Sequence, residues 1–198
     1  AFVAWCRAQG CVTLADSHTL TGDPQALIAS GAPVPAYALL EPLLGELDLF
    51  FTSADEARMI RNTLEPGNGR SGADTEGCCR SFLEFLAARF AAGAGRARLF
   101  GVTVKNGAYV CLVGPDGRAR ETRFCASRFM VGGVVDLVGA GDSFRAGLVA
   151  YVARHREAFV EGRLELDEAV QAGNLMATLY VTAPLADRYG AVPPFEAL

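Results

Sequence analysis

Short apolar runs alternate with longer segments in which apolar residues recur at helical spacing, and this alternation limits the folds open to the chain. Strands are predicted over residues 11–15, 48–52, 99–104, 109–113 and 120–124. Helices are predicted over residues 1–9, 37–47, 78–92 and 168–181, directly after Ser53, and from the segment 139–142 onward. This order is typical of an α/β fold with a mostly parallel central sheet flanked by helices. Because no linker-like stretch interrupts it, residues 1–198 are predicted to form one domain.

Polar residues and glycines predict where several of these helices begin and end. Gly10 is expected to stop the first helix, and Ser53 to cap a helix whose first turn carries Glu56. Asp167 is predicted to cap the helix that begins at residue 168. Stretches rich in Gly, Ser, Thr and Pro are predicted to be mostly loop at residues 17–35 and 66–77, with a tight turn at 114–117.

The composition excludes several classes of protein. Hydrophobic residues make up 51% of the 198 residues and charged residues 20%, which is too apolar for a disordered chain. The net charge of −4 and the lack of a basic run argue against a nucleic-acid partner. No apolar run approaches the roughly 20 residues of a membrane-spanning helix, so no membrane partner is expected. A small-molecule enzyme or an interaction domain remains, and a cytoplasmic location is expected.

The six cysteines are predicted to be free thiols in a reducing compartment. None lies in a C-x-x-C pair, and the two histidines, His18 and His155, stand alone in the sequence, so no zinc spacing can be assembled. Cys11 and Cys111 lie within apolar strand-like runs, where a thiol usually packs as a small hydrophobe. Both histidines are expected at the surface or in the core rather than in a metal site.

The segment Gly139-Ala140-Gly141-Asp142 holds the chemistry that the residues themselves suggest. Its small residues allow a ligand to approach the backbone, and its N–H groups stand at the start of a predicted helix, where anions bind well. Asp142 in the first turn is placed to accept a proton from a hydroxyl that attacks a phosphoryl group. The alternative is that the glycines only permit a tight turn and Asp142 only interacts with the helix dipole.

The longer stretch around this segment, VVDLVGAGDSFRAGL, resembles the second signature of the ribokinase family, also called the phosphofructokinase-B family of carbohydrate kinases. That signature is D-T-x-G-A-G-D-x-F-x-A-G, and a match of this length is far more specific than a lone glycine motif. Three other segments resemble family elements in the expected order, namely residues 48–58, 102–113 and 172–193. The resemblance implies a three-layer ribokinase-like fold.

The resemblance assigns roles to residues that match the family's pattern. It implies that Asp142 is the base and that the backbone of Gly139, Ala140 and Gly141 forms an anion hole for the transferred group. It places Thr103, Lys105, Gly107 and Asn174 near the nucleotide, Glu56 near Mg²⁺ through water, and Asp136 at the loop of a monovalent cation such as K⁺. The implied cofactors are therefore ATP and Mg²⁺, with K⁺ as an addition.

Two departures from the family's pattern affect these assignments. Leu137 stands where the family has Thr, and Ser53 replaces the Asn of an N-x-x-E element. Glu56 therefore has the alternative of a solvated acid in a first helical turn. Arg145, one residue beyond the motif's Phe, is predicted either to reach a phosphate or to lie at the surface.

The chain matches only the C-terminal part of the family's pattern. The early strands, the lid and the first Gly-Gly signature have no counterpart in these residues, and in the family they supply most sugar contacts and often a dimer interface. The resemblance implies an ATP-dependent kinase for a primary alcohol of a sugar or sugar-like molecule, with a nucleoside kinase and a catalytically silent nucleotide-binding member as alternatives. The 198 residues alone are expected to be inactive or prone to aggregation, because a sheet cut at its first strands exposes an edge.

Overall fold

A five-stranded sheet with helices on both faces forms the centre of the computed structural model, which describes residues 2–17, 23–67, 74–91, 95–129, 132–190 and 192–194. The strands lie in sequence order: β1 (Leu14–Asp16), β2 (Leu49–Ser53), β3 (Arg98–Val104), β4 (Gly107–Val113) and β5 (Ala119–Ala126). The pairs β1/β2 and β2/β3 are parallel, and β3/β4 and β4/β5 are antiparallel. Four strands thus run in one direction, and only β4 runs against them.

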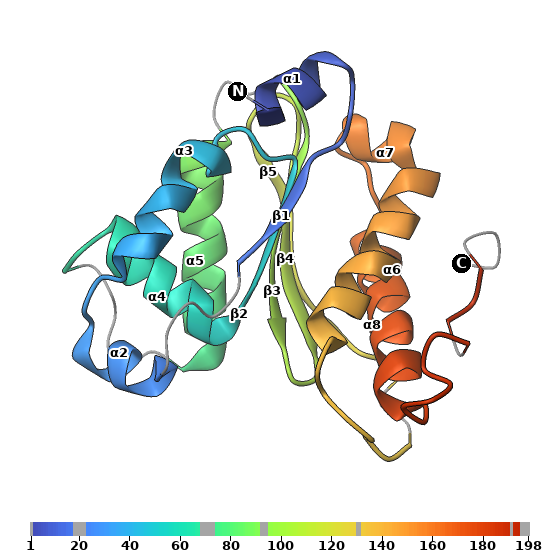
Figure 1. The fold of residues 1–198 in the computed structure, drawn as a ribbon. Helices are drawn as coiled ribbons and strands as arrows, with labels where there is room; N and C mark the ends of the chain where they lie inside the picture. The colour runs from blue at the N-terminus through green and yellow to red at the C-terminus, as the bar shows by residue number, and fades with distance from the viewer. Residues whose placement is uncertain are drawn as a thin grey trace.

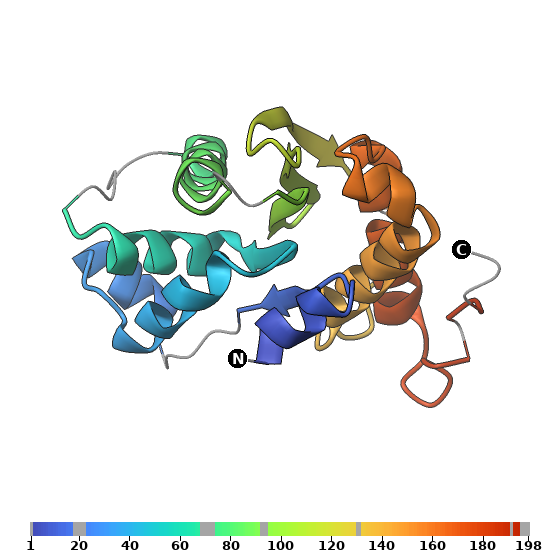
Figure 2. The ribbon, with the colours of Figure 1, turned by 90° about the horizontal axis from the view of Figure 1, so that it is seen from above.

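The helices form two outer layers, which Figures 1 and 2 show on opposite sides of the sheet. The layer that is blue to green contains α2 (Pro24–Ser30), the 3₁₀ helix η1 (Pro35–Leu40), α3 (Glu41–Leu44), α4 (Ala54–Leu64) and α5 (Thr75–Phe90). The orange and red layer contains α6 (Ala140–Arg154), α7 (Arg156–Val160) and α8 (Leu166–Thr182). Helix α1 (Phe2–Ala8) lies near the end of the sheet at which β1 begins. The predicted three-layer α/β architecture is confirmed.

Two separate apolar cores follow from the alternation of side chains along the buried strands. Phe50 and Phe100 point to the core beneath α4 and α5, whereas Leu49, Phe51 and Leu99 point to the core beneath α6 and α8. All five side chains are at most 1% exposed. Strands covered on both faces have apolar residues at every position, which is why the run from 49 to 51 shows no polar alternation.

Several of the predicted boundaries differ from those in the structure. A helix, α2, lies within the predicted loop 17–35, because Asp23 caps it through the Ala26 N–H and Gly31 ends it in the left-handed region at φ 65°. The predicted helix 37–47 is instead η1 followed by the short α3. Helix α8 begins at Leu166 with Glu165 at its cap position, so Asp167 lies in the first turn.

Glycines allow α6 and α8 to pack closely against each other. A Cβ on Gly147 would lie 2.3 Å from the Ala172 carbonyl oxygen, and one on Gly173 would lie 2.7 Å from the Phe144 ring. Phe144 and Leu148 then fill the space between these helices and the sheet, at 4% and 0% exposure. The helix that starts at the G-A-G-D segment is therefore held rigidly on the sheet.

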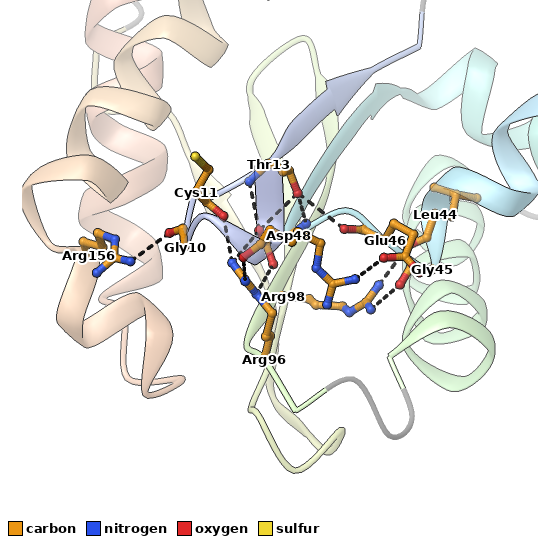
Figure 3. Close-up of polar contacts among 11 residues, drawn as sticks. Gly10, Cys11, Thr13, Leu44, Gly45, Glu46, Asp48, Arg96, Arg98 and Arg156 are labelled. Atoms are coloured by element: carbon orange, nitrogen blue, oxygen red, sulfur yellow. Dashed lines mark hydrogen bonds and ion pairs between the residues drawn. The ribbon is translucent and has the colours of Figure 1, made fainter. Parts of the chain in front are cut away.

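A polar network ties together the strand ends nearest α1, as Figure 3 shows. Both oxygens of Asp48 bind the Arg96 guanidinium, at 2.9 and 3.0 Å, and Oδ2 also accepts from the Thr13 N–H and hydroxyl. Arg96 further donates to the Cys11 carbonyl, and the buried Arg98 donates to the Leu44 carbonyl at 2.8 Å. The network joins the segments that enter β1, β2 and β3.

The search for membrane-spanning helices found no single helix in the described ranges that is long and apolar enough, and one sharply bent pair, Pro24–Ser30 with Pro35–Leu44, that passes by length and composition alone.

The six cysteines are all free thiols, and they differ strongly in burial. Burial raises the pKa of Cys79 to about 12 and that of Cys125 to about 11, whereas Cys11 is exposed. A thiol pKa near 11 leaves roughly 100-fold less thiolate at neutral pH than a pKa near 9.

Iodoacetamide at pH 8 is therefore expected to label Cys11 at least about 100-fold faster than Cys79 and Cys125 in the folded protein. Peptide mass spectrometry after timed quenching measures the three rates. In urea the rates should converge, because unfolding exposes all three thiols. Equal labelling of Cys11 and Cys79 in the native state would contradict the buried positions.

Candidate active site

The start of α6 is an open helix N-terminus with the properties of an anion site. Gly139 occupies the cap position with φ 86° and supplies no side-chain cap. A Cβ there would lie 2.8 Å from the Tyr180 ring, so both the left-handed backbone and the close packing require glycine. Ala140 donates to the Leu137 carbonyl and Ser143 to that of Gly139. No backbone acceptor among the described residues takes the N–H groups of Gly141 and Asp142.

Asp142 lies in the first turn of α6, and its side chain is exposed. The described part of the chain offers its carboxylate no hydrogen bond or ion pair. A carboxylate beside unsatisfied N–H groups and the positive end of a helix dipole would lie next to any anion that binds there. The structure thus keeps Asp142 and the three small residues together, as the sequence predicted.

Arg145 ties this helix to the C-terminal end of β1. Its guanidinium lies 2.6 Å from Asp16, and the two side chains are only 11% and 14% exposed. Space for it exists because residue 141 is glycine, where a Cβ would meet the Arg145 guanidinium at 2.4 Å. The alternative of a surface arginine is therefore wrong. Asp16 directly follows the predicted strand 11–15, but the sequence gave it no partner, because Asp16 and Arg145 lie far apart along the chain.

Glu56 is buried rather than solvated, at 5% exposure. Its Oε2 accepts from the Thr52 hydroxyl at 3.1 Å, the Ser53 N–H at 2.9 Å and the Ser17 hydroxyl at 3.4 Å. The Ser53 hydroxyl in turn accepts from the Glu56 N–H and completes a capping box. Ser17 directly follows β1 and Thr52 is the residue before the last of β2, so Glu56 lies at the same end of the sheet as the Asp16–Arg145 pair.

The next strand ends along this edge carry three of the residues predicted to lie near the nucleotide, Thr103, Lys105 and Gly107, whereas Asn174 lies within α8. The Thr103 hydroxyl donates to the Thr52 carbonyl at 3.2 Å, and Lys105 is exposed in the turn between β3 and β4. Gly107 begins β4 with φ 149°, where a Cβ would lie 2.2 Å from the Cys125 carbonyl oxygen. Asn174 is 7% exposed, and its amide lies 3.4 Å from Gln171.

Gln171 connects Asn174 to this turn. It donates to the Ala126 carbonyl at 2.8 Å and accepts from the Arg128 N–H, while the Ser127 N–H binds the Asn106 carbonyl. Helix α8 and the β3–β4 turn therefore meet at the end of β5.

Asp136 precedes the G-A-G-D segment and is held from two sides. One carboxylate oxygen accepts from the Val138 N–H at 3.0 Å, and the other lies 3.3 Å from the Arg188 guanidinium. The Val138 amide, followed by Arg188, holds the pKa of Asp136 below its usual value, so the carboxylate is ionised at neutral pH. Arg188 received no role from the sequence.

Comparison with known proteins assigns the chain to a family. The model of the pfkB family carbohydrate kinases matches residues 30–189. The chain belongs to this family. No curated protein sequence matches it.

Solved structures of similar fold are kinases that this pfkB chain matches at low identity. An Anopheles gambiae adenosine kinase bound to P1,P4-di(adenosine-5) tetraphosphate has a TM-score of 0.61 and 16% identity, over 96% of this chain and 48% of its own. A Schistosoma mansoni adenosine kinase in complex with adenosine and AMP has a TM-score of 0.61 and 17% identity, over 91% of this chain and 44% of its own. A Vibrio cholerae fructokinase double mutant bound to fructose, ADP and potassium has a TM-score of 0.58 and 18% identity, over 96% of this chain and 53% of its own. The pfkB chain thus spans about half the length of these kinases.

Most candidate residues of this pfkB chain gather at one edge of the sheet, where β1, β2, β3 and β5 end and α6 begins (Figure 1). The side chains that hold them in place, Asp16, Ser17, Thr52, Gln171 and Arg188, were not predicted. For Asp16 and Thr52 the only indication in the sequence was their position at the ends of predicted strands. Such edges commonly bind ligands in α/β folds.

Proposed function

We propose that the protein carrying this chain transfers the γ-phosphoryl group of ATP to a primary alcohol of a sugar or sugar-like molecule. The open N-terminus of α6, with Gly139 in a left-handed cap and Asp142 exposed in the first turn, is the observation that supports the proposal. The N–H groups of Gly141 and Asp142 would stabilise the charge that develops on the transferred group, whereas the N–H of Ala140, which was predicted to share this role, already donates to the Leu137 carbonyl. Asp142 would accept the proton of the attacking hydroxyl at a carboxylate oxygen.

The arrangement around α6 favours catalysis rather than simple anion binding. Close packing of Gly147 and Gly173 fixes the helix axis, and the Arg145–Asp16 pair fixes its first turn against β1. A rigid anion site preserves the position of the donors as charge develops, which is the condition under which they lower a barrier. Leu137, which replaces the family's Thr, is 68% exposed and leaves these backbone donors in place.

Mg²⁺ is proposed to accompany the nucleotide. In phosphoryl-transfer sites this ion is bound by substrate phosphates, several waters and one or two carboxylates, and it neutralises charge on the phosphates. Glu56 is the carboxylate at the strand ends that fits such a role. Because its Oε2 already accepts three hydrogen bonds, Glu56 would contact the ion through water.

Acceptor-dependent formation of ADP is the expected result when the protein is assayed with ATP and a panel of sugars, sugar acids and nucleosides. Coupled detection of ADP, with each acceptor omitted in turn, measures it. ADP formation that depends on nucleosides, and on no other acceptor in the panel, would favour the nucleoside-kinase alternative. Binding of ATP without ADP formation on any acceptor would instead indicate a catalytically silent member of the family.

A further inference from the structure

Arg188 is a buried cation placed against the segment that leads to the anion site. It lies in the turn that follows α8 and is 6% exposed, although its neighbours Leu185 and Tyr189 are 65% and 83% exposed. Its guanidinium lies 3.3 Å from Asp136 Oδ2. An arginine turned inward from an otherwise exposed turn, toward a carboxylate, indicates a specific role for the charge.

A second contact connects Arg188 to the G-A-G-D segment. The guanidinium stacks 4.5 Å from the centre of the Tyr180 ring, and the same ring fills the space next to the Gly139 α-carbon. Asp136 in turn accepts from the Val138 N–H, one residue before Gly139. Arg188 therefore supports the loop through the Asp136 carboxylate and through Tyr180.

This arrangement does not fit a monovalent cation at Asp136, the site that the family resemblance implied. Of the two carboxylate oxygens, one accepts from Val138 and the other is paired with Arg188. An added K⁺ at this carboxylate would lie beside a guanidinium that is permanently charged, and the two would repel each other. The single positive charge that K⁺ would bring is already present on the side chain.

We propose that Arg188 takes the place of the monovalent cation in this chain, so that the loop before α6 is ordered without K⁺. Arg188 is a positioning residue, because it acts on the G-A-G-D segment through Asp136 and Tyr180. The consequence for catalysis, a reaction that does not depend on K⁺, rests on the proposed function. The consequence for K⁺ binding does not.

Thermal unfolding tests the proposal without any need for turnover. The melting temperature of the wild-type protein should be the same in potassium chloride and in tetramethylammonium chloride at equal ionic strength. In R188A the freed Asp136 should bind K⁺, and K⁺ at roughly ten times its Kd should raise the melting temperature by about 3–6 °C. The double variant R188A/D136N should lose this response, and R188K, which keeps the charge, should resemble wild type.

The control is R163A, which removes an exposed arginine paired with Glu161 and should leave the response to K⁺ unchanged. A rise in the wild-type melting temperature specific to K⁺ would overturn the proposal, and so would an R188A protein that folds but ignores K⁺. If R188A fails to fold, the melting temperatures of the wild-type and R188K proteins in the two salts still test the proposal. For an active protein, wild-type kcat should also be equal in the two salts.

Discussion

Replacement of Asp142 by Asn should lower kcat for phosphoryl transfer by about 10²–10⁴-fold, the range that a positioned general base contributes. The amide has nearly the same shape but cannot accept a proton from the attacking hydroxyl. The Asp142 side chain is exposed and has no partner in the described part of the chain, so its loss should change the melting temperature little. Binding of ATP, followed by calorimetry, should remain close to wild type.

The matched control is E168Q. Glu168 has the same third position in α8 that Asp142 has in α6, is also exposed, and pairs with the exposed Arg128. Both variants remove one negative charge from the first turn of a helix in the same layer. A D142N protein with the wild-type kcat would disprove the role of Asp142 as the base. An equal loss in both variants would point to helix stability rather than to proton transfer.

Removal of the Asp48 carboxylate should be the most destabilising single change at the end of the sheet nearest α1. The side chain is 2% exposed and binds the Arg96 guanidinium with both oxygens. In D48A the buried Thr13 N–H loses its acceptor, and the Arg96 guanidinium, whose side chain is 28% exposed, keeps its contact with the Cys11 carbonyl (Figure 3). Because Arg96 is partly exposed, the cost should lie toward the lower end of the roughly 3–5 kcal/mol that is lost when a buried pair is broken.

Urea unfolding of D48A, followed by circular dichroism, measures this loss of unfolding free energy. The melting temperature should fall by about 6–20 °C. The control E121A removes one partner of an exposed pair on β5, in which both side chains are 45% exposed, and should cost less than about 1 kcal/mol. A cost for D48A as small as that for E121A would show that the network does not hold β1, β2 and β3 together.

The segments that were predicted best are those whose information is local. Ser53 and Glu56 form their capping box within four residues, and the strands around Phe50 and Phe100 follow from unbroken apolar runs. The G-A-G-D segment lies at the start of a helix, as predicted. This position could be predicted because Gly139 and the first residues of α6 follow one another directly in the chain. The α2 helix was missed because its cap, Asp23, lies in a stretch whose composition resembles a loop.

The sequence alone determined the α/β class, the family resemblance and the segment that holds the proposed base, because periodicity, caps and a contiguous motif all act over a few residues. Only the tertiary structure decided which charges meet. It turned Arg145 inward to Asp16, buried Glu56 among Ser17 and Thr52, and brought Arg188 to Asp136. Such pairs depend on how two layers of helices pack on one sheet. A buried charge is costly unless it is paired, so each of these side chains pairs with the polar group that packing brings next to it.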